Sequence, residues 1–137
     1  MANEPTLLIY DELNFNVGDE TFLDSITENG NAVVFEDDGT TGYFYAVNST
    51  DNSIMDALHV YDVSSIIDKH KSSKVKILWN NSQTRAFLTI NDYYHAVFDF
   101  IYKSGYCRNG FPESYGSWSN NSDRKLTDDL FVRLAEK

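Results

Sequence analysis

The spacing of short strand-like segments constrains the fold of this chain most strongly. Between residues 32 and 107, runs of β-branched and aromatic residues alternate with short polar links. Residues 33–35 and 43–47, for example, flank a polar segment that carries Asp38-Gly39, and this composition is typical of a hairpin. Because links this short join antiparallel neighbours, the pattern predicts a meander.

The same reasoning gives a set of expected strands and two expected loops. In residues 75–79, apolar side chains alternate with lysines, which indicates a strand with one face in water. Residues 64–72 are crowded with Ser, Asp and Lys, and residues 108–123 are rich in Gly, Ser and Asn, so we expect loops there. The expected strands span residues 6–10, 21–26, 33–35, 43–47, 57–61, 75–79, 85–90 and 94–100.

The end of the chain carries helix signals instead. Thr127 can cap a helix, and Asp128 and Asp129 suit the positive helix N-terminus. An apolar stripe follows, formed by Leu130, Phe131 and Leu134. We therefore expect a helix over about residues 127–136. The sequence predicts one domain over residues 1–137, of the α+β class but mainly β. Its core would be a curved antiparallel meander sheet of about six to eight strands, partly covered by the C-terminal helix.

The charge of the chain excludes some classes of partner. The formal net charge is −10, whereas nucleic acids and anionic membranes are bound by basic surfaces. A basic protein remains as an expected partner, although acidity alone also serves solubility. Cys107 is the only cysteine, so no intrachain disulfide can form. The apolar run at residues 7–10 is too short for a signal peptide or a membrane span, and we expect a cytoplasmic protein.

Three consecutive acids, Glu36-Asp37-Asp38, raise the question of a metal site. A helix–loop–helix calcium site needs acids at alternating positions and a glutamate six residues after its glycine, but here Tyr45 lies six residues after Gly39. Consecutive strand residues also point to opposite faces. We therefore expect no metal. We expect exposed acids at a hairpin turn, where Asp37 or Asp38 caps backbone N–H groups and Gly39 takes a positive φ.

Aromatic residues are the second feature of a candidate binding surface. Tyr43 and Tyr45 share one face of the strand that follows the acids, and Tyr115 and Trp118 lie in the late loop. Tyr and Trp are enriched where proteins bind other proteins, although they also serve simply as core residues. The candidate partner-binding residues are Glu36, Asp37, Asp38, Tyr43, Tyr45, Tyr115 and Trp118.

A second set of residues would serve an enzyme or a metal-dependent protein. His59, His95 and Cys107 lie on three expected strands, but no metal-ligand spacing joins them, so we predict no zinc site. Asp99 lies in an otherwise apolar strand, where burial would raise its pKa and suit it to act as a general acid. A structural ion pair is the commoner use of such a carboxylate, and its candidate partners are Arg85, Lys103 and Arg108. The alternative site is His59, His95 and Asp99.

Four segments occur along the chain in a characteristic order: "VVFEDDGTTGYFYA", "DALHVYDV", "HAVFDF", and "GYCR" followed closely by "FP". Together they resemble a family of small acidic bacterial proteins known only as a domain of unknown function. The resemblance runs from about Val17 to Trp118. It implies a single cytosolic bacterial domain with no assigned reaction, ligand or catalytic residue, so no residue role follows from it.

Two functions remain open at this point. The first is a non-catalytic protein-binding module, of which an immunity-type antidote to a basic toxin is one form. Its support is the acidity, the small β-rich domain, and the lack of a phosphate-binding loop or a nucleophile elbow. The alternative is a small enzyme or metal-dependent protein that uses His59, His95 and Asp99. A toxin gene beside this one would favour the first, and a metabolic operon the second.

Overall fold

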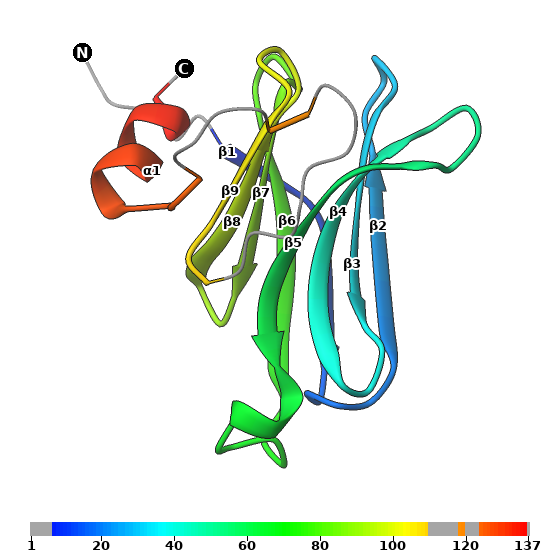
Figure 1. The fold of residues 1–137 in the computed structure, drawn as a ribbon, viewed down its shortest axis with the longest axis vertical. Helices are drawn as coiled ribbons and strands as arrows, with labels where there is room; N and C mark the ends of the chain where they lie inside the picture. The colour runs from blue at the N-terminus through cyan, green and yellow to red at the C-terminus, as the bar shows by residue number, and fades with distance from the viewer. Residues whose placement is uncertain (1–6, 110–117, 120–123, 137) are drawn as a thin grey trace.

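A computed structural model describes residues 7–109, 118–119 and 124–136 of the chain. These residues form nine strands, one short 3₁₀ turn and one α-helix (Figure 1). The strands are β1 (Leu7–Phe15), β2 (Thr21–Ile26), β3 (Asn31–Asp37), β4 (Thr41–Asn48), β5 (Ile54–Asp62), β6 (Ser73–Asn80), β7 (Arg85–Ile90), β8 (Tyr93–Asp99) and β9 (Ser104–Cys107). The turn η1 spans Val63–Ser65, and the helix α1 spans Asp128–Ala135.

The strands form two antiparallel sheets. One has the order β1-β6-β7-β8-β9 and the other the order β2-β3-β4-β5. The predicted mainly-β antiparallel class with one C-terminal helix is confirmed, but the strands divide between two sheets where we expected one curved sheet. The division has a physical reason, because β7 is buried at every position and its sheet therefore needs cover on both faces.

The main core fills the space between the two sheets. Its inward-facing residues include Val33, Phe35, Phe44 and Leu58 from the four-stranded sheet and Val75, Ile77, Trp79, Leu88 and Phe98 from the five-stranded sheet. The rings of Phe44 and Phe98 meet across the gap with their centroids 5.0 Å apart. Trp79 donates from Nε1 to the Ser25 hydroxyl at 2.9 Å, which satisfies an indole N–H that burial would otherwise leave unpaired.

A second apolar cluster lies on the other face of the five-stranded sheet, where α1 covers it (Figure 1). Leu134 of α1 packs in one cluster with Leu78, Phe87, Val97 and Leu126. The predicted N-cap is confirmed, because the Thr127 side chain accepts a hydrogen bond from the Leu130 N–H at 3.1 Å. The apolar stripe of the helix is therefore what covers the sheet. No helix among the described residues has the length and apolar character needed to cross a membrane.

Two buried arginines hold the C-terminal segment against the sheets, one through an ion pair and one through a hydrogen bond to the helix backbone. Asp56 of β5 is fully buried and accepts a hydrogen bond from Arg124 Nη2 at 2.9 Å. Arg85 donates from Nε to Asp99 at 2.8 Å and from Nη1 to the Leu134 carbonyl oxygen at 3.2 Å. Removing one partner of a buried pair leaves an uncompensated charge, so these contacts fix where the helix lies.

Candidate functional site

The outer face of the four-stranded sheet is rich in apolar side chains that the described residues leave uncovered. Alternation along β3 and β4 turns Phe35 and Phe44 into the core and their neighbours outward. The strand register aligns the outward residues in three rows: Phe22–Glu36–Tyr43–His59, Asp24–Val34–Tyr45–Ala57 and Ile26–Ala32–Val47–Ile54. We call these residues the open face. Among the described residues, no helix lies over it (Figure 1).

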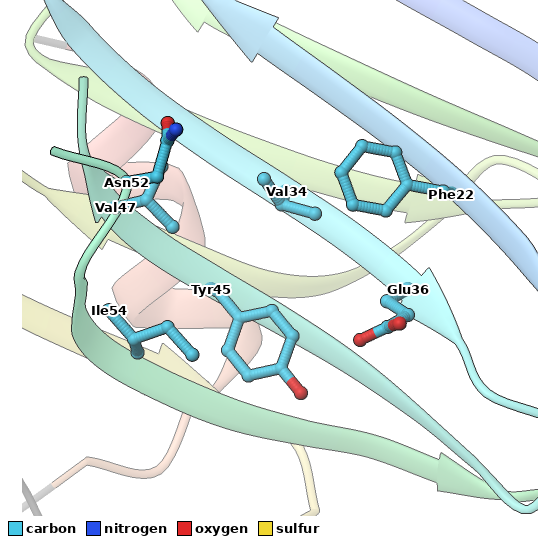
Figure 2. Close-up of a pocket in the computed structure, with 7 residues that line it drawn as sticks. All are labelled: Phe22, Val34, Glu36, Tyr45, Val47, Asn52 and Ile54. Carbon is cyan, nitrogen blue, oxygen red and sulfur yellow. The ribbon is translucent and has the colours of Figure 1, made fainter. Parts of the chain in front are cut away.

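The open face is hollowed near its centre (Figure 2). The hollow has a volume of about 390 Å³ and is lined by Phe22, Val34, Glu36, Tyr45, Val47, Asn52 and Ile54. In Figure 2, Val34 lies between the rings of Phe22 and Tyr45, with Glu36 toward one end and Asn52 toward the other. Phe22 is 61% exposed although it is a large apolar side chain. Contiguous exposed apolar surface of this kind marks interaction sites on soluble proteins.

A stack of three rings runs beside the hollow. The Tyr43 ring lies between Tyr45, whose centroid is 5.6 Å away at an interplanar angle of 15°, and His59, at 5.0 Å and 13°. His59 Nε2 lies 3.0 Å from Asp62 Oδ1, which holds the outermost ring in place. Rings that are already packed against one another lose little side-chain entropy when a partner binds.

Glu36 is the acid that adjoins both the hollow and the stack. The register places it opposite Phe22 on β2 and opposite Tyr43 on β4, and such neighbours have Cβ atoms about 5 Å apart. Its side chain is half-buried. No lysine or arginine pairs with its carboxylate in the described part of the chain. Among the described residues, Glu36 is therefore a carboxylate without a cation, next to an aromatic residue on each neighbouring strand.

The expectation that all three acids are exposed is wrong for Asp37, which is 1% exposed. Asp37 shares the inward parity of Phe35, and its carboxylate accepts hydrogen bonds from the N–H of Gly18 at 2.7 Å and of Gly39 at 2.8 Å. The Tyr61 hydroxyl donates to it at 2.6 Å. Burial, and then Asp37, raise the pKa of Tyr61. Asp37 is thus a structural residue that ties the end of β3 to the loop between β1 and β2 and to β5.

Asp38 behaves as the hairpin prediction requires. It is exposed, and its Oδ1 accepts from the N–H groups of Thr41 at 2.8 Å and Thr40 at 2.9 Å. These bonds hold the pKa of Asp38 below its usual value, with the Thr41 N–H as the largest cause. Gly39 has the predicted positive φ, of 95°. The acidic stretch is therefore a capped turn between β3 and β4, with one buried acid.

The two aromatic candidates from the late loop do not join the open face. Tyr115 lies outside the described residues. Trp118 is only 6% exposed, and its ring contacts Phe100 and Phe98 edge-on with centroid distances of 5.2 and 6.1 Å. Trp118 therefore completes the main core, which is the alternative use that the sequence left open, and it is not placed to bind a partner on the surface.

The residues of the alternative site lie in three different layers. His59 belongs to the open face, His95 lies next to the main core, and Asp99 faces α1 through its ion pair with Arg85. The predicted structural pairing of Asp99 is therefore confirmed. Cys107 is buried, and its thiol donates to the His59 carbonyl oxygen, while the His59 ring points away. Within the described residues, no three potential metal ligands converge.

His95 borders a second hollow, of about 270 Å³, that adjoins η1. The apolar walls of this hollow include Val17, Val60, Ile66 and Ile90. The Nδ1 atom of His95 is buried and makes no hydrogen bond with the described residues. Burial, and then the nearby Arg108 guanidinium, lower the pKa of His95 to about 4. The ring is therefore neutral at pH 7 and exerts no charge on the core.

Comparison with known proteins agrees with the resemblance seen in the sequence. Residues 15–135 match a family described as "Uncharacterized protein conserved in bacteria (DUF2251)". The chain belongs to this family. An uncharacterized protein of Haemophilus influenzae is 43% identical to it, over 74% of this chain and 69% of that protein. No solved structure gives a significant match. The family match includes the whole four-stranded sheet and therefore every strand of the open face.

The charges of this family member are distributed unevenly, which our sequence reasoning missed. No lysine or arginine precedes Lys69, whereas fourteen of the 21 acidic residues do. That stretch forms β1 and all four strands of the open face. The net charge of −10 gives only the sum and hides this asymmetry. Counting the charges separately in the two halves of the sequence would have found it.

Proposed function

We propose that the protein is a non-catalytic protein-binding module that docks a basic partner on its open face. The observation that carries this proposal is a hollowed apolar sheet face in a region of the chain without lysine or arginine. Apolar surface supplies affinity, and surrounding acids favour a basic partner and speed the encounter at low salt. The strands of this sheet carry no lysine or arginine that would repel a basic partner.

An immunity-type antidote is the biological role that we infer for such a module. An antidote has to cover the working surface of a basic toxin domain, and it needs no catalytic group of its own. The strong acidity and the open face both suit this task. The alternative of a small enzyme that uses His59, His95 and Asp99 lacks support from a shared site, because the three side chains lie in different layers.

Selection from a random peptide library tests the proposed surface. The protein is immobilised, bound peptides are enriched, and their affinities are measured for the double variant Phe22→Ser with Ile54→Ser. Both side chains are exposed, so the double variant should stay folded. We expect peptides that combine lysine or arginine with aliphatic residues, and at least about tenfold weaker binding to the variant. Binding should weaken as salt is added.

The matched control replaces exposed apolar residues elsewhere, Ile67→Ser with Ile101→Ser, and should leave the affinity unchanged. Equal losses in both double variants, or enrichment of acidic peptides, would contradict the proposal.

The antidote role is checked separately by expressing the neighbouring reading frame with and without this gene. Growth arrest that this protein relieves, but its Phe22→Ser, Ile54→Ser variant does not, is the expected result.

A further inference from the structure

We infer that the open face recognises one arginine side chain of the basic partner, seated between Glu36 and the ring stack of Tyr45, Tyr43 and His59. This inference rests on the proposed function and names the chemical group that the surface selects. The guanidinium would pair with the Glu36 carboxylate and lie against a tyrosine ring. The aliphatic residue beside that arginine would enter the hollow at Phe22, Val34 and Ile54.

The position of Glu36 is the first argument. It is the only acid in the lining of the hollow, and Figure 2 shows its carboxylate beside the Tyr45 ring. The other acid of the open face, Asp24, lies in the next row and is exposed to water. Glu36 is half-buried and has no cation in the described part of the chain. A partly desolvated carboxylate gains more from a cation than a fully exposed one does.

The rings supply the second argument. Tyr43 and Tyr45 are nearly parallel to each other, and Tyr43 is nearly parallel to His59. Electron-rich ring faces attract a cation, and the carboxylate across the strand adds its charge at the same place. A hydrophobic ligand alone would gain from the rings but would leave Glu36 unpaired and desolvated, which costs free energy.

Arginine fits this arrangement better than lysine does. A planar guanidinium can stack on a ring while its edge forms two parallel hydrogen bonds with a carboxylate. A lysine ammonium is a more strongly hydrated point charge and cannot satisfy both contacts in one plane. The site therefore takes an arginine within a segment that also carries an aliphatic residue.

Nuclear magnetic resonance titration of the full chain with N-acetylarginine methylamide tests the inference. The citrulline derivative is the matched ligand control, because it has nearly the same shape and no charge, and the lysine derivative tests the preference for a planar cation. We expect saturable shifts of the Glu36, Tyr43 and Tyr45 signals at millimolar concentrations. The citrulline derivative should bind at least about fivefold more weakly, and the lysine derivative between the two.

Two protein variants locate the contact. Glu36→Gln should weaken binding of the arginine derivative at least about fivefold and abolish its advantage over citrulline. Glu28→Gln, which removes an exposed acid in the turn between β2 and β3, is the matched control and should change nothing. Tyr45→Leu keeps an apolar side chain but removes the ring face, so it should also weaken the arginine derivative.

Equal shifts by the arginine and citrulline derivatives would overturn the inference. So would the absence of shifts on the open face up to roughly 50 mM, a concentration at which even very weak binding is visible. An equal effect of Glu28→Gln and Glu36→Gln would show general charge attraction only and would also overturn it. The proposed function fails by a different result: it fails if selected peptides ignore the open face altogether.

Discussion

The outer faces of the two sheets have similar side chains but different surroundings. On the five-stranded sheet, Phe87 and Val97 lie under the apolar stripe of α1 and are buried. On the four-stranded sheet, Phe22 and Ile54 face water, and no described helix lies over them. The chain covers the first face with a capped helix, and Arg85, which pairs with Asp99 in that sheet, also donates to the Leu134 carbonyl oxygen of the helix. The contrast shows that the described part of the chain covers one apolar sheet face and leaves the other exposed.

The same contrast applies to charge. The helix-covered sheet uses its cations within the molecule, as in the pairs of Arg85 with Asp99 and of Arg108 with Asp128. The strands of the open face contain no lysine or arginine to pair with their acids. Asp56 obtains its cation from Arg124, far along the chain, and Glu36 obtains none within the described residues. The two sheets therefore differ in charge pairing: acids of the helix-covered sheet are paired with cations of the chain, whereas Glu36 of the open face has none among the described residues.

The largest expected effect comes from breaking the ion pair that joins the two regions. Arg124→Met leaves the buried carboxylate of Asp56 without its cation, so we expect a loss of about 3–5 kcal/mol in the free energy of unfolding. Urea denaturation followed by tryptophan fluorescence measures this loss. Arg133→Met, on the exposed side of α1, is the control and should stay within about 0.5 kcal/mol of the unaltered chain. A small effect of Arg124→Met would show that the segment before α1 is not held by this pair.

A direct test of the comparison truncates one apolar side chain on each outer surface. Leu134→Ala should cost about 2–4 kcal/mol, because Leu134 is 8% exposed and packs against the five-stranded sheet. Phe22→Ala on the open face should change the stability by no more than about 0.5 kcal/mol. The measurement is again urea denaturation. Equal losses at the two positions would mean that the open face is buried in solution, for instance by self-association, which analytical ultracentrifugation would detect.

The smallest effect concerns the space between the sheets, where His95 is held neutral. Its pKa is lowered to about 4, whereas an unfolded histidine titrates near its ordinary value of 6.5. The unfolded chain therefore takes up a proton first, and the stability that this residue contributes above pH 6.5 is lost as the pH falls toward 4. Between pH 7 and pH 5 we expect a loss of about 2 kcal/mol that His95→Gln removes.

Exposed His70 supplies the control for this pH dependence, because His70→Gln should leave the pH profile of the unaltered chain unchanged. Titration of the His95 ring signals by nuclear magnetic resonance gives the pKa directly. A measured pKa near 6.5 would contradict the burial of this ring.

Sequence reasoning found the elements whose signals are local. The Thr127 cap, the acids of the first turn and the apolar stripe all belong to one short segment, and the helix forms there. The hairpin at Asp38-Gly39 is another local signal, with its cap and its positive φ in place. Asp99 was also predictable as a structural acid, because a lone carboxylate in an apolar strand requires a cation and Arg85 was among the candidates.

The features that sequence reasoning missed depend on contacts between residues that are distant along the chain. Asp37 is buried because strand parity turns it inward and Tyr61 meets it, 24 residues away. Trp118 enters the core from a segment that looked like a surface loop. The open face itself required the strand register, since only the pairing of β2, β3 and β4 brings Phe22, Glu36 and Tyr43 into one row. No local pattern contains that information.

The missing lysines also determine which chemical tools can work on this protein. Reagents that attach to lysine side chains will react after residue 68 and leave the strands of the open face unlabelled. The protein can therefore be tethered or dye-labelled through its lysines without blocking the proposed docking surface. Lysine-reactive crosslinkers, by contrast, will report little about a partner on that surface, and carboxyl-to-amine coupling is the chemistry that can capture it. Trypsin, which cuts after lysine and arginine, should make no cut within residues 1–68.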